Sequence, residues 1–208
     1  MMMSKSECMI AMNNKGVDLM EAGKFKDALL SLNKGLAIAT KCVRNRTYNS
    51  SFFTNPDAIH WSSNLLRQRD HCPTSPFLHD RAMRISEKSS FSTSVLGALT
   101  FNFALTSHLR CMEIGEKGWE LMRKALKIYS KSLSLFRSSP LCLVVLNNMR
   151  LINHEIGDHR AANACRYELR KTIDVFPLFL KTEENKGVCK EIMLNLFALN
   201  EPTLAPAA

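Results

Sequence analysis

The stretch from His154 to His159 reads His-Glu-Ile-Gly-Asp-His, which is close to a known catalytic pattern. Zinc proteases carry two histidines four residues apart on one helix face, with a glutamate base between them. Here the second histidine is five residues away and follows a Gly-Asp turn, so the two imidazoles would not share a helix face. The spacing argues against a metalloprotease site.

Other potential ligands and nucleophiles are scattered. His60, His71, Cys72 and His79 lack the two close ligand pairs of a structural zinc site. The seven cysteines never form a Cys-x-x-Cys pair, which is typical of reduced thiols that act as small buried hydrophobes. The chain also has no nucleophile elbow, phosphate-binding loop or dinucleotide fingerprint. We therefore expect no metal, no cofactor and no catalysis.

A basic and aromatic stretch lies within residues 41–92, where helical periodicity disappears. Cations and rings alternate there in a way that single-stranded nucleic acid favours, although Asp57 and Asp70 dilute the charge. Either the stretch is an irregular, mobile insertion with an extended piece at 77–86, or its aromatic residues pack it back onto the helices. The residues concerned are Arg44, Arg46, Phe52, Phe53, Trp61, Arg67, Arg69 and Phe77.

Apolar residues at three- and four-residue steps predict helices on both sides of this insertion. We expect one domain over residues 6–199, followed by a flexible tail at 200–208. Its predicted parts are a first helix pair at 6–40, the irregular insertion at 41–92, a second pair at 93–137, a third pair at 138–175 and a capping helix at 182–199.

The first pair has small residues at Gly16, Ala28 and Gly35 and a turn at Gly23. This spacing resembles the tetratricopeptide (TPR) unit, and the later pairs match it more loosely, with Asn102 and Asn148 in the place of Asn14. The layout also resembles short TPR-like proteins that form large paralogue families in single-celled algae. The resemblance implies an all-α fold: a TPR-like α-solenoid of about three antiparallel helix pairs plus a C-terminal capping helix.

In TPR proteins the first helix of each pair lines a concave groove that binds a peptide or a partner helix. The resemblance places nine residues of this chain in such a groove. Core packing, or burial of these side chains by the insertion, is the alternative. The nine residues are Asn13, Val17, Met20, Phe101, Leu105, His108, Asn147, Leu151 and His154.

Charged chaperone tails are unlikely partners for this groove. TPR domains that bind them use a carboxylate clamp of Lys, Asn and Arg, and only Asn102 fits a clamp position. Asn13 and Val17 replace the expected Lys and Asn, and Val144 and Asn148 replace the expected Lys and Arg. A carboxylate would therefore find few charged donors.

Composition limits the remaining classes. Lys and Arg number 28 against 19 Asp and Glu, and the surplus is divided almost evenly between the two halves, as on a solvated surface. No apolar run approaches the roughly 20 residues of a membrane helix, and the first residues do not read as a secretory signal. We expect a cytoplasmic protein, with a nuclear location not excluded. The predicted function is a non-catalytic protein-protein interaction scaffold, the alternative being an RNA-binding adaptor that uses 41–92.

Overall fold

The computed structural model describes residues 3–44, 58–62 and 79–176, together with 188, 192, 193, 195 and 196. Within these ranges the chain is predominantly helical, which confirms the predicted class. The elements are α1 (Lys5–Glu21), α2 (Phe25–Arg44), β1 (Ile59–Trp61), β2 (Met83–Ile85), α3 (Thr93–Ile114), the 3-10 helix η2 (Gly115–Gly118), α4 (Trp119–Leu135), α5 (Cys142–Glu155) and α6 (His159–Val175).

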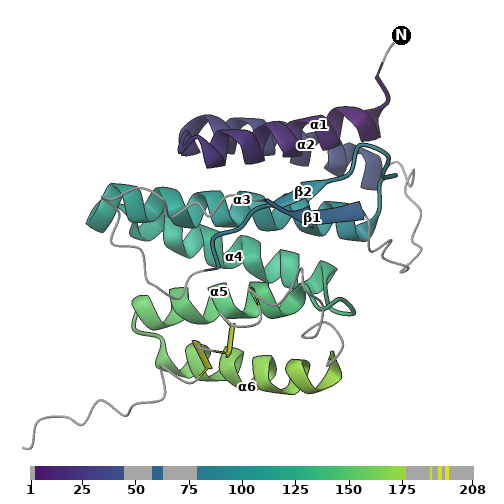
Figure 1. Ribbon diagram of the computed structural model, residues 1–208. Coiled ribbons are helices and arrows are strands. Elements are labelled where there is room, and N and C mark those ends of the chain that lie inside the picture. Colours follow the sequence, from purple (N-terminus) through teal and green to yellow (C-terminus); the bar gives the residue numbers. More distant parts are fainter. Residues whose placement is uncertain are drawn as a thin grey trace, which may run out of the picture.

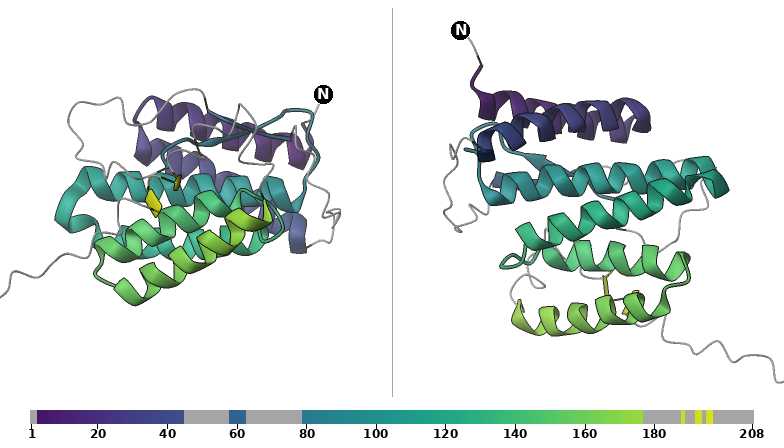
Figure 2. Two further views of the ribbon diagram at one scale, coloured as in Figure 1. Left: turned by 60° about the horizontal axis from the view of Figure 1, so that its bottom comes forward. Right: turned by 180° about the vertical axis from the view of Figure 1, so that it is seen from behind.

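The helices form a stack along which the chain proceeds from α1 to α6 (Figure 1). Each helix packs mainly against the helices next to it in sequence, and the view from behind shows the same order (Figure 2). The predicted first pair corresponds to α1 and α2, the second to α3 and α4, and the third to α5 and α6. Short connections join the two helices within each pair, whereas α2 and α3 pack side by side although residues 45–92 separate them in sequence.

Local signals at the helix ends explain the boundaries. Ser4 accepts a hydrogen bond from the backbone N–H of Glu7, whose side chain accepts one from the N–H of Ser4. This reciprocal capping box satisfies two amides that the first turn of a helix leaves unbonded. Gly23 follows α1 with a φ of 66°, a left-handed conformation that costs glycine little.

Close helix contacts occur where glycines face large side chains. A Cβ added at Gly16 of α1 would lie 2.6 Å from Leu32 Cγ of α2, and one added at Gly97 of α3 would lie 2.7 Å from Phe136 Cε1. Neither position has room for a methyl group. The small residues that the sequence placed at these crossings thus allow the helices to approach one another.

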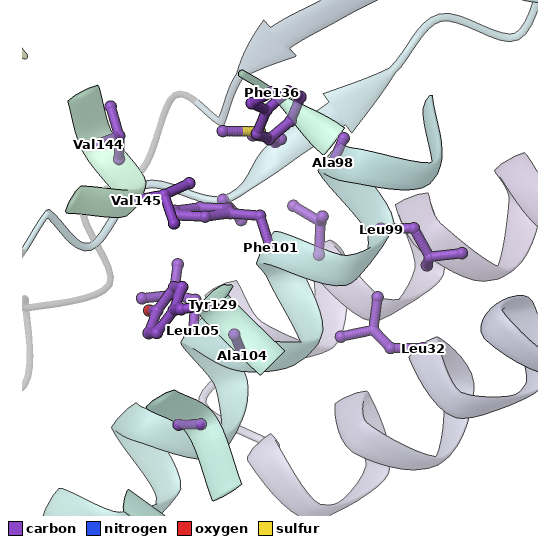
Figure 3. Close-up of a cluster of buried hydrophobic side chains, with 14 of the residues drawn as sticks. Leu32, Ala98, Leu99, Phe101, Ala104, Leu105, Tyr129, Phe136, Val144 and Val145 are labelled. Carbon is purple, nitrogen blue, oxygen red and sulfur yellow. The ribbon is translucent and has the colours of Figure 1, made fainter. Parts of the chain in front are cut away.

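The core lies between neighbouring helices of the stack. Phe101, Leu105 and Tyr129 are fully buried, and the rings of Phe101 and Tyr129 are 5.7 Å apart between centroids. Figure 3 shows Leu99 of α3 beside Leu32 of α2, on the side of α3 away from these rings. The middle helix α3 therefore buries residues on both sides, which fits the consecutive buried residues along it at 97–102 and 104–109.

The region predicted as an irregular insertion is partly regular. Helix α2 continues to Arg44, and β1 pairs with β2 in an antiparallel sheet in which His60 lies opposite Arg84. Strand β2 falls within the extended piece predicted at 77–86. Residues 45–57 and 63–78 lie outside the described residues.

The C-terminal predictions fall mostly on residues that the structure does not describe. Between 182 and 199 the described positions are helical, and Val188, Ile192 and Leu196 are buried at four-residue steps. The predicted tail at 200–208 is outside the described part. Among the residues described, no helix is long and apolar enough to cross a membrane.

Candidate functional site

An extended segment of the chain, residues 79–85, lies across α1, α3 and α5; we call it the bound segment. In Figure 1 its strand β2 crosses α3 near α1, and the residues before β2 run toward α5. Strand β2 packs against both α1 and α3. The bound segment thus touches the first helix of all three pairs.

Asparagine side chains hold the backbone of the bound segment. The Asn102 side chain of α3 accepts a hydrogen bond from the N–H of Met83 at 2.8 Å and donates one to its carbonyl at 2.7 Å. Asn14 of α1 repeats the arrangement at Ile85, with distances of 3.0 Å and 2.8 Å. Each amide therefore satisfies both backbone groups of one residue, as a neighbouring strand would.

Asn148 of α5 makes the third pair of bonds. It accepts from the N–H of His79 at 3.1 Å and donates to the His79 carbonyl at 3.0 Å. Its amide nitrogen also lies 3.2 Å from the Tyr129 hydroxyl, and burial raises the pKa of Tyr129. We call Asn14, Asn102 and Asn148 the asparagine ladder.

The members of the asparagine ladder recur at equivalent positions of the three helix pairs. Its three members occupy the same position in α1, α3 and α5, one residue after the predicted groove residues Asn13, Phe101 and Asn147. Asparagine is a poor helix former, so its recurrence at one interior position of three helices indicates a hydrogen-bonding role for its side chain. Asn102 and Asn148 match Asn14 in the sequence pattern of the helix pairs, but that pattern alone does not identify the bound segment as their partner.

The opposite edge of β2 is paired with β1. The N–H of Ser62 donates to the Ala82 carbonyl at 2.8 Å, and the N–H of Ser86 donates to the Ala58 carbonyl at 2.9 Å. Backbone groups of a strand alternate between its two edges. Consequently Ala82 and Ser86 face β1, whereas Met83 faces the asparagine ladder.

Side chains of β2, within the bound segment, alternate between buried and partly exposed. Met83 and Ile85 are buried, and between them the Arg84 guanidinium lies 2.7 Å from the Asp18 carboxylate and 2.8 Å from the Glu21 carboxylate. Partial burial acts to lower the pKa of Arg84, but the hydrogen bond to Asp18 and the charges of both carboxylates raise it overall. Two carboxylates near the C-terminal end of α1 therefore bind a cationic side chain.

Eight of the nine predicted groove residues are buried, and His154 is exposed. Asn13 belongs to the same network, since it donates to the Met83 carbonyl at 3.0 Å and accepts from Asn102 at 2.9 Å. Around Asn13 the structure shows the alternative that the sequence left open, because part of the insertion, at Met83, buries this side chain. The buried residues are Asn13, Val17, Met20, Phe101, Leu105, His108, Asn147 and Leu151.

Asn195 covers the α5 end of this face. It donates to the Asn147 side chain at 2.7 Å, and its carbonyl accepts from Arg150 Nη1 at 2.7 Å. Burial and the nearby charges of Arg166 and Arg170 lower the pKa of Arg150. Arg150 of α5 thus binds the backbone of the described C-terminal helical residues.

The other candidates from the sequence do not assemble into a site in the described part of the chain. The rings of His154 and His159 are 5.5 Å apart, yet no group of three or more His, Cys, Asp or Glu residues suited to a metal occurs among the described residues. His71, Cys72 and most of the basic and aromatic insertion lie outside those residues. Trp61 is described and packs edge-on against His79 at 4.7 Å between centroids.

The arrangement can recognise a polypeptide backbone. Each asparagine side chain makes two hydrogen bonds to the N–H and C=O groups of one residue, and these bonds do not depend on the side chain of that residue. The buried positions of Met83 and Ile85 and the carboxylates beside Arg84, in contrast, do select between side chains. Comparison of the chain with protein-family models, curated proteins and solved structures finds no match.

Proposed function

We propose that this chain is a non-catalytic protein-interaction scaffold that binds an extended polypeptide segment along α1, α3 and α5. The observation that carries the proposal is the asparagine ladder, in which each of three amides bonds both backbone groups of one residue. On one edge, an extended peptide presents the N–H and C=O groups of alternate residues. Strand β2 is then an intramolecular occupant of the binding surface.

The order and packing of the helices support this proposal and, with it, a proposed TPR-like arrangement. The helices follow one another in a stack, glycines occupy close crossings such as Gly16 against Leu32, and the first helix of each pair carries one ladder asparagine. Repeated helix pairs of this kind present their first helices on one extended surface. A row of equivalent positions on that surface suits a ligand that is itself extended.

Occupation by β2 sets the conditions for binding. A tethered segment competes at a local concentration that reaches the millimolar range for short flexible connections. A partner in solution therefore gains access when the contacts of β2 weaken. The ladder bonds are each worth roughly 0.5–1.5 kcal/mol net, so removal of one backbone donor shifts this competition measurably.

The experiment uses Met83→Pro as an opening variant, because proline has no N–H to donate to Asn102. A fluorescent peptide with the sequence of residues 79–87 is added to the full-length chain, and binding is followed by anisotropy. We expect Met83→Pro to bind the peptide at least about tenfold more tightly than the unmodified chain. Adding Asn102→Leu in the same background should remove this binding.

Asn163→Leu is the matched control, since Asn163 is exposed on α6 and should leave peptide binding unchanged. Circular dichroism establishes that each variant is helical. Arg84→Glu serves as a second opening variant should Met83→Pro lose its fold, because it reverses the charge beside Asp18 and Glu21. Absence of binding to a folded opened chain, or binding that survives Asn102→Leu, would refute the proposal.

A further inference from the structure

We infer that the partner presents an extended segment in which a basic residue lies between two apolar residues. This inference rests on the proposed function and adds the chemistry of the ligand. Its starting point is the sequence of the occupant itself, Met83-Arg84-Ile85. These residues show which side chains the surface accepts.

The apolar positions follow from burial. Met83 is 0% exposed and Ile85 is 2% exposed, and their backbone groups are the ones bound by Asn102 and Asn14. Because side chains two residues apart point to the same side of a strand, both enter the same interior. A charged residue at either position would be buried without a partner.

The basic position follows from charge. Asp18 and Glu21 stand one helical turn apart on α1, and the Arg84 guanidinium contacts both. An acidic residue in place of Arg84 would face two carboxylates at close range. The surface therefore favours Arg or Lys at the central position and disfavours Glu or Asp.

The pocket beside this position has a mixed surface that continues along α1. This pocket of about 630 Å³ is lined by the apolar Met3, Ile10 and Ala11, the polar Asn14, the acidic Glu7, Asp18 and Glu87, and the basic Lys15. It adjoins both the ladder asparagine of α1 and one of the two carboxylates. A ligand longer than β2 thus has room to continue past the position of Ile85.

The test compares peptides that differ only at the central position. Each has the sequence of residues 79–87, with Arg, Lys or Glu at the place of Arg84, and each is titrated into full-length Met83→Pro. We expect the Arg and Lys peptides to bind about tenfold or more tightly than the Glu peptide. A peptide with serine in place of both Met83 and Ile85 should bind more weakly than the Arg peptide.

Asp18→Lys in the opened chain should reduce or reverse the preference for the Arg peptide. Asp174→Lys is the matched control, because it makes the same change in net charge at an exposed position of α6. The chain with this control change should still prefer the Arg peptide to the Glu peptide at physiological salt.

Equal binding of the Arg and Glu peptides, still dependent on Asn102, would overturn this inference and leave the proposed function standing. No binding of any peptide would overturn both. A concentration-dependent dimer of the unmodified chain that the Arg peptide dissociates would assign the surface to a second copy of the chain, and so would overturn the assignment to a different partner.

Discussion

Replacing Asn102 by alanine tests the physical account of the asparagine ladder. The change leaves the Met83 N–H buried without its acceptor, and it removes the Asn102 amide group that donates to Asn13 Oδ1. The Met83 carbonyl keeps the bond from Asn13. An unpaired buried donor costs roughly 1–3 kcal/mol and a lost bond about 1 kcal/mol, while the better helix propensity of alanine returns about half a kcal/mol.

The expected loss in the free energy of unfolding is therefore about 2–3 kcal/mol, which corresponds to a fall in Tm of about 5–10 °C for a chain of this size. Urea unfolding followed by circular dichroism measures the loss. Amide hydrogen exchange shows where in the chain the stability is lost, because the backbone amides of residues 79–92 should exchange faster in Asn102→Ala than in the unmodified chain. Asn163→Ala, at an exposed position of α6, should change stability by less than about 0.5 kcal/mol.

Asn102→Asp adds a pH test of the same geometry. One oxygen can still accept from Met83, but the other would point at the Met83 carbonyl and the Asn13 oxygen. Burial and these acceptors should raise the pKa of the new carboxyl above its ordinary value. The folded state then binds more protons than the unfolded state, so the loss in the free energy of unfolding relative to the unmodified chain should shrink as the pH falls.

An Asn102→Ala chain whose free energy of unfolding lies within about 0.5 kcal/mol of that of the unmodified chain, with unchanged amide hydrogen exchange, would refute the reasoning.

Three further changes have expected outcomes. Gly97→Ala should lower the free energy of unfolding by about 1–3 kcal/mol in urea denaturation, because its methyl group would overlap the buried ring of Phe136; stability equal to that of the unmodified chain would contradict the close contact. Burial raises the pKa of Cys142 to about 11, so its alkylation at pH 8 should be much slower in the folded than in the urea-unfolded chain, as peptide mass spectrometry can measure. Asp158→Ala removes the cap that accepts from the N–H of Ala161 at 2.9 Å and should cost about 1 kcal/mol in thermal unfolding; no change in Tm would argue against the cap.

Helix periodicity and turn residues were enough to place the helices. Gly23 and Gly157, which have φ of 66° and 78°, separate helices where the sequence indicated turns. Apolar spacing repeats locally, so each helix can be read from its own residues. The predicted TPR-like stack and its function stay predictions.

The contacts of the bound segment could not be read in this way. His79 and Asn148 are 69 positions apart, and Ile85 and Asn14 are 71 apart. No local period links such residues, and a three-residue strand carries too little alternation to be distinguished from a loop. Of the side chains predicted to face a ligand, Asn13 bonds the Met83 carbonyl, whereas the paired backbone bonds come from the asparagine one position further along each helix.

The bound segment also bears on how the chain folds. In a linear array of repeats each unit contacts only its neighbours, so stability is roughly a sum of local terms and the ends can unravel independently. Here Ile85 bonds the first helix pair, Met83 the second and His79 the third, in each case between residues distant in sequence. Such non-local contacts raise the contact order and slow folding. They also link the pairs, so that loss of one should weaken the others and the array should unfold as a single cooperative unit.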